Sequence, residues 1–233
     1  MRGGTIILKS RCKFFLRRFR AGLRRASGVA NPLFRIGVCV LVLTSATKAQ
    51  APAKYFARVE TTKGTFVLEV NRDWASRGAD RLYELIKAGY YDDTRFTRVV
   101  PNFIVQFGIA RDSATNAKWK DATILDDSVK QSNVEGTFGF AMRKPNDRTT
   151  QIYISLTDNS RLDTAGFSPV GRVVRGMDVV KSIYSGYGES SGGGVRAGKQ
   201  APLMNGGNAY VDREYPKLDK LLRITIIPSL PPS

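Results

Sequence analysis

The stretch Phe96–Gly108 constrains the fold of this chain more than any other part of its sequence. Residues alternate in the manner of a strand up to Val100, the pair Pro101-Asn102 interrupts the pattern, and the alternation resumes from Phe103. Alternation with a period of two is typical of a strand with one buried face, and a Pro-Asn pair favours a turn. The stretch therefore predicts two strands that fold back on each other as an antiparallel pair.

The remaining sequence predicts more short strands and only two helices. Lys63-Gly64 separates two alternating runs and predicts a β-hairpin. Helices are expected where apolar residues recur at helical spacing, over residues 79–86 and 177–184, each ended by a glycine. Residues 111–135 and the Gly- and Ser-rich residues 186–208 are expected to be loops. We expect strands over residues 55–62, 65–70, 137–142, 151–155, 169–174 and 222–227, which together indicate a mainly β antiparallel barrel or sandwich.

Charge and residue usage exclude several classes of function. The formal charge is +17, but residues 1–49 hold 11 of the 37 Lys and Arg residues and no acidic residue, which leaves +6 on residues 50–233. The basicity is therefore no argument for a nucleic-acid partner, and we expect none. The chain has no histidine, and its two cysteines, Cys12 and Cys39, precede the predicted domain. The predicted domain therefore cannot use Ser-His-Asp or Cys-His catalysis. It also lacks the residues for the usual zinc sites and for a disulfide framework.

Residues 1–49 have the layout of a secretory leader. A short apolar run, Ile36–Leu43, follows a basic segment, and small residues precede a plausible cleavage point after Ala49. The run is too short to span a bilayer comfortably, so no stable membrane span is expected after cleavage, although an uncleaved anchor is an alternative. The basic part is unusually long. Either it contains a twin-arginine export signal, such as Arg24-Arg25, or translation starts later, for example at Val29.

Three blocks of sequence, in order, resemble the cyclophilin-type peptidyl-prolyl cis-trans isomerases. The first is Phe96–Gly108; the others are Gly136–Met142 with the following Gln151–Ile154, and Leu162-Asp163 with Gly171–Val180. The resemblance covers residues 55–228, and the tail is similar to a bacterial exported branch of the family. It implies a closed eight-stranded antiparallel barrel capped by two α-helices. The expected organisation is a leader over 1–49, a linker over 50–54, the isomerase domain over 55–228 and a tail over 229–233.

The resemblance also implies a set of site residues. Arg98 corresponds to the family's essential arginine and is expected to be catalytic together with Phe103 and Gln106. The residues expected to bind substrate are Ile104, Tyr153, Leu162 and Phe167 around the proline ring, and Ala141, Met142 and Gln151 along the peptide backbone. The family needs no cofactor or metal, so neither is expected.

The sequence departs from the eukaryotic pattern of the family at three of these positions and at Arg161 beside them. Arg161 stands where many members have tryptophan, and Phe167 stands near the place of the pocket histidine. Met142 replaces an asparagine, and Tyr153 replaces the usual phenylalanine. Arg98, Phe103 and both glutamines remain, so activity is expected, whereas cyclosporin binding, which in the family depends on the tryptophan, is expected to be weak.

Prolyl isomerisation suits a chain without histidine. Rotation about an Xaa-Pro bond is blocked by amide resonance, with a barrier of roughly 18–20 kcal/mol. A thousandfold acceleration needs only about 4 kcal/mol, which positioning and a fixed positive charge can supply. The sequence therefore predicts a monomeric isomerase of proline-containing polypeptides, in the periplasm or secreted, that assists the folding of exported proteins. The alternative is a non-catalytic module or holdase that binds prolyl peptides without turnover.

Overall fold

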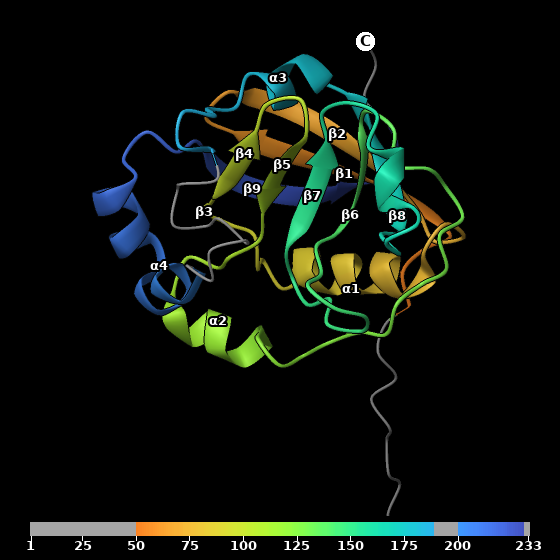
Figure 1. Ribbon diagram of the computed structural model, residues 1–233, viewed down its shortest axis with the longest axis horizontal. Coiled ribbons are helices and arrows are strands. Elements are labelled where there is room, and N and C mark those ends of the chain that lie inside the picture. The colour runs from red at the N-terminus through yellow and green to blue at the C-terminus, as the bar shows by residue number, and fades with distance from the viewer. Residues whose placement is uncertain (1–49, 189–199, 231–233) are drawn as a thin grey trace, which may run out of the picture. The chain divides into compact units, whose positions relative to one another are not determined.

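The computed structural model describes residues 50–188 and 200–230, and these form one curled antiparallel sheet with helices around it (Figure 1). Its first two strands, β1 (Lys54–Thr61) and β2 (Gly64–Asn71), form the predicted hairpin, closed where Thr61 faces Gly64. Gly64 has a φ of +126°, which L side chains rarely adopt, so the glycine permits this tight connection. Alternate residues of β1 are buried, as its sequence pattern predicts.

In residues 50–188 and 200–230, nine strands pair in a single order that brings the two edges of the sheet together. The order is β3-β9-β1-β2-β8-β6-β7-β5-β4. Its two ends, β3 and β4, are separated in the chain only by Phe96 and Thr97, so one extended stretch forms both edges of the sheet. If β3 and β4 are counted as one bent strand, the predicted eight strands are recovered. The remaining strands are β3 (Thr94–Arg95), β4 (Arg98–Val100), β5 (Ile104–Phe107), β6 (Thr137–Phe140), β7 (Ile152–Ser155), β8 (Pro169–Arg175) and β9 (Lys220–Ile227).

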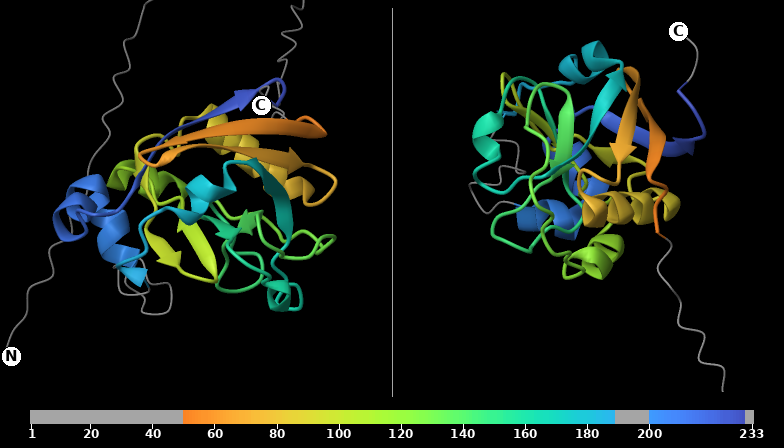
Figure 2. Two further views of the ribbon diagram at one scale, coloured as in Figure 1. Left: turned by 90° about the horizontal axis from the view of Figure 1, so that it is seen from above. Right: turned by 90° about the vertical axis from the view of Figure 1, so that its right-hand side faces the viewer.

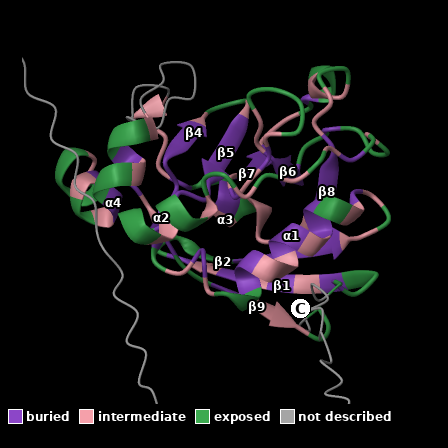
Figure 3. Ribbon diagram, turned by 90° about the horizontal axis from the view of Figure 1, so that it is seen from below, coloured by how far each residue is buried: buried purple, intermediate pink, exposed green. Residues whose placement is uncertain are grey.

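The two predicted helices lie at opposite ends of the curled sheet, as the views in Figures 1 and 2 show. The first, α1 (Ser76–Lys87), buries an apolar face that includes Ala79, Leu82 and Leu85, and these side chains belong to the main core. Figure 3 shows buried and intermediate residues along this helix. The second, α3 (Met177–Lys181), is shorter than predicted and buries Val180 in the same core. The predicted mainly β antiparallel fold with two capping α-helices is thus confirmed. The sheet curls into a half-barrel, and its nine strands in the described residues differ little from the predicted closed barrel of eight.

Two further helices correct the loop predictions. Residues 111–135 contain α2 (Ser113–Trp119), which begins after Asp112, whose side chain accepts a hydrogen bond from the Thr115 backbone N–H. Residues 186–208, predicted as a loop, contain the start of α4 (Gln200–Glu214), which is kinked at Gly207. A second small core, made of Ile109, Leu203, Val211 and Leu218, lies between α4 and the segments beside it. Helix α4 is therefore stabilised by tertiary packing, which the sequence pattern did not indicate.

The domain includes residues that were expected to form a linker. Ala51 is buried in the main core, and its backbone N–H donates to Asp80. The predicted leader, residues 1–49, and the last three tail residues lie outside the described residues. Within residues 50–188 and 200–230, no helix is both long and apolar enough to cross a membrane.

Candidate active site

The β4–β5 hairpin places Arg98 directly opposite Gln106. The pairing register joins Arg98 to Gln106 and Val100 to Ile104, and the turn between the strands is closed by a hydrogen bond from the Phe103 N–H to the Val100 carbonyl. Asn102, in the turn, has a φ of +57°, a conformation that asparagine tolerates better than most residues. Because paired residues project on the same face, the Arg98 Nη1 donates to Gln106 Oε1 at 3.2 Å.

The candidate site lies on the face of the sheet opposite the core. Val99, Val105 and Ile154 point into the main core. Their strand neighbours Arg98, Gln106 and Tyr153 project to the other face, because successive side chains of a strand point to opposite sides. Gln106 pairs with Tyr153 across β5 and β7, so the three residues form one row across three strands.

Hydrogen bonds between side-chain amides extend this row toward α4. Gln106 Nε2 donates to Gln151 Oε1 at 2.8 Å. Gln151 Nε2 in turn donates to Gln200 Oε1 at 2.9 Å. Arg98 thus begins a continuous chain of polar contacts, and the orientation of each amide is fixed by its neighbour.

Aromatic rings lie at both ends of the row, one beside Arg98 and one at Tyr153. The Phe103 ring contacts two guanidinium groups, with its centroid 5.5 Å from Arg98 Cζ and 4.7 Å from Arg161 Cζ. The Tyr153 ring meets the Phe167 ring edge to face, with centroids 5.7 Å apart. These rings form an apolar surface beside a cation. Such a surface suits a ligand with an apolar group next to an amide bond.

The predicted backbone-binding residues line one cavity of about 480 Å³ beside the amide row. Gln106, Ala141, Met142 and Gln151 contribute to its wall. Leu162 is placed next to Phe167 by the loop backbone, since the Phe167 N–H donates to the Leu162 carbonyl. Ile104 is buried on β5, on the same face as Gln106. The structure therefore places four of the predicted residues around one cavity, brings the Phe103 ring to Arg98 and brings the Tyr153 ring to Phe167. Ile104 and Leu162 are linked to these groups through strand register and a backbone hydrogen bond.

Burial keeps the Tyr153 hydroxyl protonated. Desolvation raises the pKa of Tyr153, which is only 2% exposed. Its Oη donates to Asn133 Oδ1 at 2.5 Å. The polar group inside the aromatic surface is therefore a neutral donor that has a partner.

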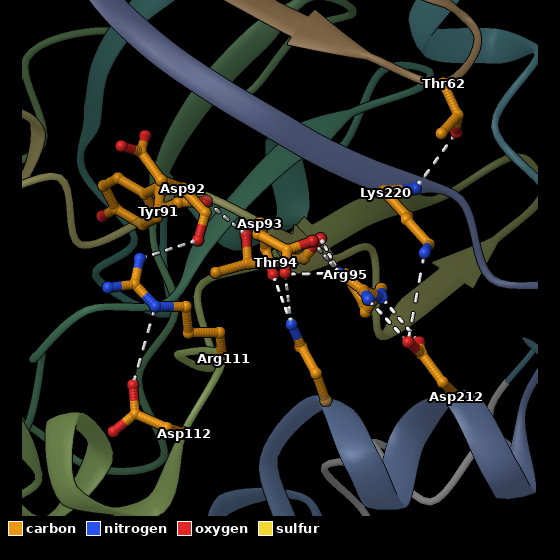
Figure 4. A network of polar contacts seen from close by, with 11 residues as sticks. Thr62, Tyr91, Asp92, Asp93, Thr94, Arg95, Arg111, Asp112, Asp212 and Lys220 are labelled. Atoms are coloured by element: carbon orange, nitrogen blue, oxygen red, sulfur yellow. Dashed lines mark hydrogen bonds and ion pairs between the residues drawn. The ribbon is translucent and has the colours of Figure 1, made fainter.

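Three residues of the site were not predicted. The sequence indicates no contact for Arg161 beyond its replacement of a tryptophan, and Asn133 and Gln200 come from segments expected to be loops. Gln200 reaches Gln151 because α4 is fixed elsewhere: Arg95 donates to both carboxylate oxygens of Asp212, each at 2.8 Å (Figure 4). No local pattern in the sequence indicates this link between β3 and α4, because it depends on the fold.

Comparison with known sequences identifies one family. The profile of the family described as cyclophilin type peptidyl-prolyl cis-trans isomerase/CLD matches residues 56–203. A peptidyl-prolyl cis-trans isomerase of Acinetobacter baylyi is 31% identical over 144 residues, which cover 58% of this chain and 74% of that protein. Peptidyl-prolyl cis-trans isomerase A of Dickeya dadantii is 30% identical over 156 residues, or 63% of this chain and 80% of that protein.

Solved structures show the same fold at lower identity. A cyclophilin-type peptidyl-prolyl cis-trans isomerase of Cryptosporidium parvum has a TM-score of 0.56 at 18% identity, over 76% of this chain and 99% of that chain. The cyclophilin AquaCyp293 of Hirschia baltica has a TM-score of 0.52 at 16% identity, over 79% of this chain and 78% of that chain.

Proposed function

This chain belongs to the family of cyclophilin-type peptidyl-prolyl cis-trans isomerases, and on that premise we propose that it isomerises Xaa-Pro bonds at the site built around Arg98. Its substrates are proline-containing polypeptides. The observation that carries the assignment of the site is the position of Arg98, between the Phe103 ring and the Gln106 amide. One side chain thereby places a fixed positive charge between an apolar surface and a row of amides.

Arg98 supplies the electrostatic part of catalysis. When the Xaa-Pro bond twists, resonance is lost and the proline nitrogen regains a lone pair. A guanidinium donates to that lone pair more strongly than to the planar amide, so the twisted state is stabilised relative to the ground state. The hydrogen bond from Arg98 to Gln106 restrains the guanidinium in advance, which reduces the reorganisation needed during the reaction.

The ring surface and the cavity hold the two sides of the bond that rotates. We assign the proline ring to the surface formed by Phe103, Tyr153 and Phe167, and the neighbouring peptide backbone to Gln106 and Gln151. A structure of the Cryptosporidium isomerase in the presence of the dipeptide Ala-Pro, with a TM-score of 0.55 to this chain, supports a prolyl ligand for this fold. Clamping the ring while the preceding carbonyl turns is sufficient, and no covalent step is required.

The decisive experiment is a protease-coupled isomerisation assay on the full chain and on Arg98→Ala. We expect Arg98→Ala to lose at least a hundredfold in kcat/KM, or about 2.7 kcal/mol of transition-state stabilisation. Arg223→Ala is the matched control, because Arg223 is a strand arginine paired with Glu60 at an exposed position of β9. If Arg98→Ala keeps its turnover while folded, the site is wrongly assigned.

The same assay separates catalysis from binding alone. A chain that binds a proline-containing peptide, by fluorescence or calorimetry, but does not accelerate isomerisation is a binding module or holdase. The retained Arg98 argues for turnover, because a binding module has no need of a donor aimed at the twisted amide.

We further propose that the enzyme acts on exported proteins, in the periplasm or outside the cell. The support is the basic segment, the apolar run Ile36–Leu43 and the small residues before Ala49. Sequencing the N-terminus of protein recovered from separated cell fractions tests this: a start at Gln50 in the exported fraction is expected, and an intact leader in the membrane fraction supports an anchor instead.

A further inference from the structure

Asn133 lies behind the proposed proline pocket and is completely buried, with a relative exposure of 0%. Its Oδ1 accepts from the Tyr153 hydroxyl at 2.5 Å. Its Nδ2 donates to Asp163 Oδ1 at 2.6 Å and to the Phe167 carbonyl at 2.8 Å. One amide therefore joins a residue of β7 to two residues of the loop between β7 and β8.

The backbone of Asn133 makes two further links to the same loop. Its N–H donates to Asp163 Oδ1 at 2.9 Å, and its carbonyl accepts from the Asn159 N–H at 2.7 Å. Asn159 Nδ2 then donates to the Phe103 carbonyl at 2.8 Å. The contacts of Asn133 thus reach Tyr153 and Phe167 directly and reach Phe103 through one intermediate residue.

We propose that Asn133 is a positioning residue for the isomerase, which sets the spacing of the three aromatic walls that clamp the proline ring. The inference rests on the site proposed above and extends it to a residue that lies behind the pocket. Asn133 acts through Tyr153, through the loop that carries Phe167, and through Asn159.

The loop needs such an anchor because little regular structure holds it. Between the end of β7 at Ser155 and the start of β8 at Pro169, the only helix is the single 3-10 turn Ser160–Leu162. Asp163, which follows that turn, also accepts from Ser132 Oγ at 2.5 Å. A loop held by a few side-chain hydrogen bonds shifts readily when one of them is removed, since a buried group that loses its partner costs about 1–3 kcal/mol.

The depth of the Tyr153 ring is fixed from the opposite side. A Cβ added at Gly139 would lie 2.9 Å from Tyr153 Oη and 3.2 Å from Cε1. The ring therefore lies closely against β6, and its hydroxyl reaches Asn133. Asn133 and Gly139 together determine where the Tyr153 wall of the pocket stands.

Asn133→Asp is the sharpest test, because the shape of the side chain is kept while its two N–H donors are lost. At pH 8 the new carboxylate faces the Asp163 carboxylate and the Phe167 carbonyl, so the loop is repelled. We expect KM for a short Xaa-Pro peptide to rise about tenfold with kcat within twofold, as for a loss of uniform binding. Lowering the pH to 5 favours protonation of the new carboxyl group, which restores one donor and lowers KM toward the wild-type value.

Tyr153→Phe is a milder test than Asn133→Asp, and Tyr55→Phe is its matched control. Both substitutions remove one buried tyrosine hydroxyl with one hydrogen bond; that of Tyr55 is made to the Ala79 carbonyl at 3.0 Å, in the core beside α1. We expect KM to rise about threefold in Tyr153→Phe and to stay unchanged in Tyr55→Phe. Urea unfolding shows whether Asn133→Asp folds. If it does not fold, the two tyrosine variants decide whether Asn133 has the positioning role.

The outcomes separate the inference from the site on which it rests. The positioning role is overturned if folded Asn133→Asp has the wild-type KM at pH 8, or if the two tyrosine variants have equal KM values. Arg98→Ala is assayed together with the Asn133 variant and with the tyrosine variants. Loss of turnover there leaves the proposed site standing, whereas retained turnover shows that the site itself is wrong. The titratable and charged groups facing Asn133 and Tyr153 are Asp163 and Arg148, and both are kept in every variant.

Discussion

Phe103 shows how the site combines apolar and charged groups. Its ring lies under the guanidinium of Arg98, the proposed catalytic group, and closer still to that of Arg161. A cation over a ring face is attracted by the ring quadrupole, by about 0.5–1 kcal/mol at exposed positions. Arg161 therefore covers one edge of the proposed proline pocket with a charged plane, at the position where the resemblance leads us to expect tryptophan.

The first residue-scale prediction concerns this position. We expect Arg161→Trp to tighten cyclosporin binding at least tenfold, or about 1.4 kcal/mol, because an apolar indole replaces an exposed cation beside Phe103. Inhibition of isomerase activity by cyclosporin measures the change. Arg172→Trp, at an exposed position of β8, is the control. Equal inhibition of the Arg161→Trp variant and the wild type contradicts the prediction.

At the scale of elements, α4 is held to the barrel by an ion pair in addition to its small apolar core. Arg95 of β3 is only 3% exposed and contacts both Asp93 and Asp212 (Figure 4). Asn208 of α4 donates to the Asp93 carbonyl at 2.7 Å. The hydrogen bonds from Arg95 lower the pKa of Asp212, so its carboxylate stays ionised in this contact. Through this contact α4 brings Gln200 to the amide row.

The element-scale prediction is that Asp212→Asn loosens α4. Asp212→Asn removes the negative charge and one of the two acceptor oxygens that face a buried arginine, and we expect unfolding stability to fall by about 1.5–3 kcal/mol. Hydrogen exchange is expected to rise in residues 200–214 before it rises in the sheet. Asp73→Asn, at an exposed aspartate outside this network, is the control. Unchanged exchange in α4 is the result that rejects this account of its docking.

At the scale of the whole molecule, the response to pH is set by aspartates. Hydrogen bonds lower the pKa of Asp112 and Asp212, and they outweigh the opposing effect of partial burial at Asp80 and Asp163. A carboxyl group with a lowered pKa in the folded state stabilises that state fully above its unfolded pKa, near 3.9, and loses the contribution as the pH falls through the folded value.

The corresponding prediction is a loss of stability only in acid. We expect the urea midpoint to be flat from about pH 5 to 8 and to fall steadily below about pH 4. Activity is expected to be flat from about pH 6 to 8.5, since the chain has no histidine and burial raises the pKa of Tyr153. Urea titrations and kcat/KM across this range measure both. A bell-shaped activity profile near neutral pH contradicts the proposed mechanism.

The sequence alone determined the parts of the protein that depend on local pattern. Alternation defined the β1–β2 and β4–β5 hairpins, and a period of 3.6 residues defined α1, because both patterns follow from the direction in which successive side chains point. Arg98, Phe103 and Gln106 lie within one hairpin. Their positions in the sequence are therefore enough to predict that they lie close together in the folded chain.

Only the tertiary structure decided the contacts between distant segments. Asn133 meets Tyr153, Gln200 meets Gln151, and Arg95 meets Asp212 across separations of 20, 49 and 117 residues. Neither α2 nor α4 has the clear apolar periodicity of α1, so the sequence pattern predicts loops in their place. Such contacts form only after the barrel has brought its strands together, because a side-chain hydrogen bond is too weak to overcome by itself the entropy of closing a long loop.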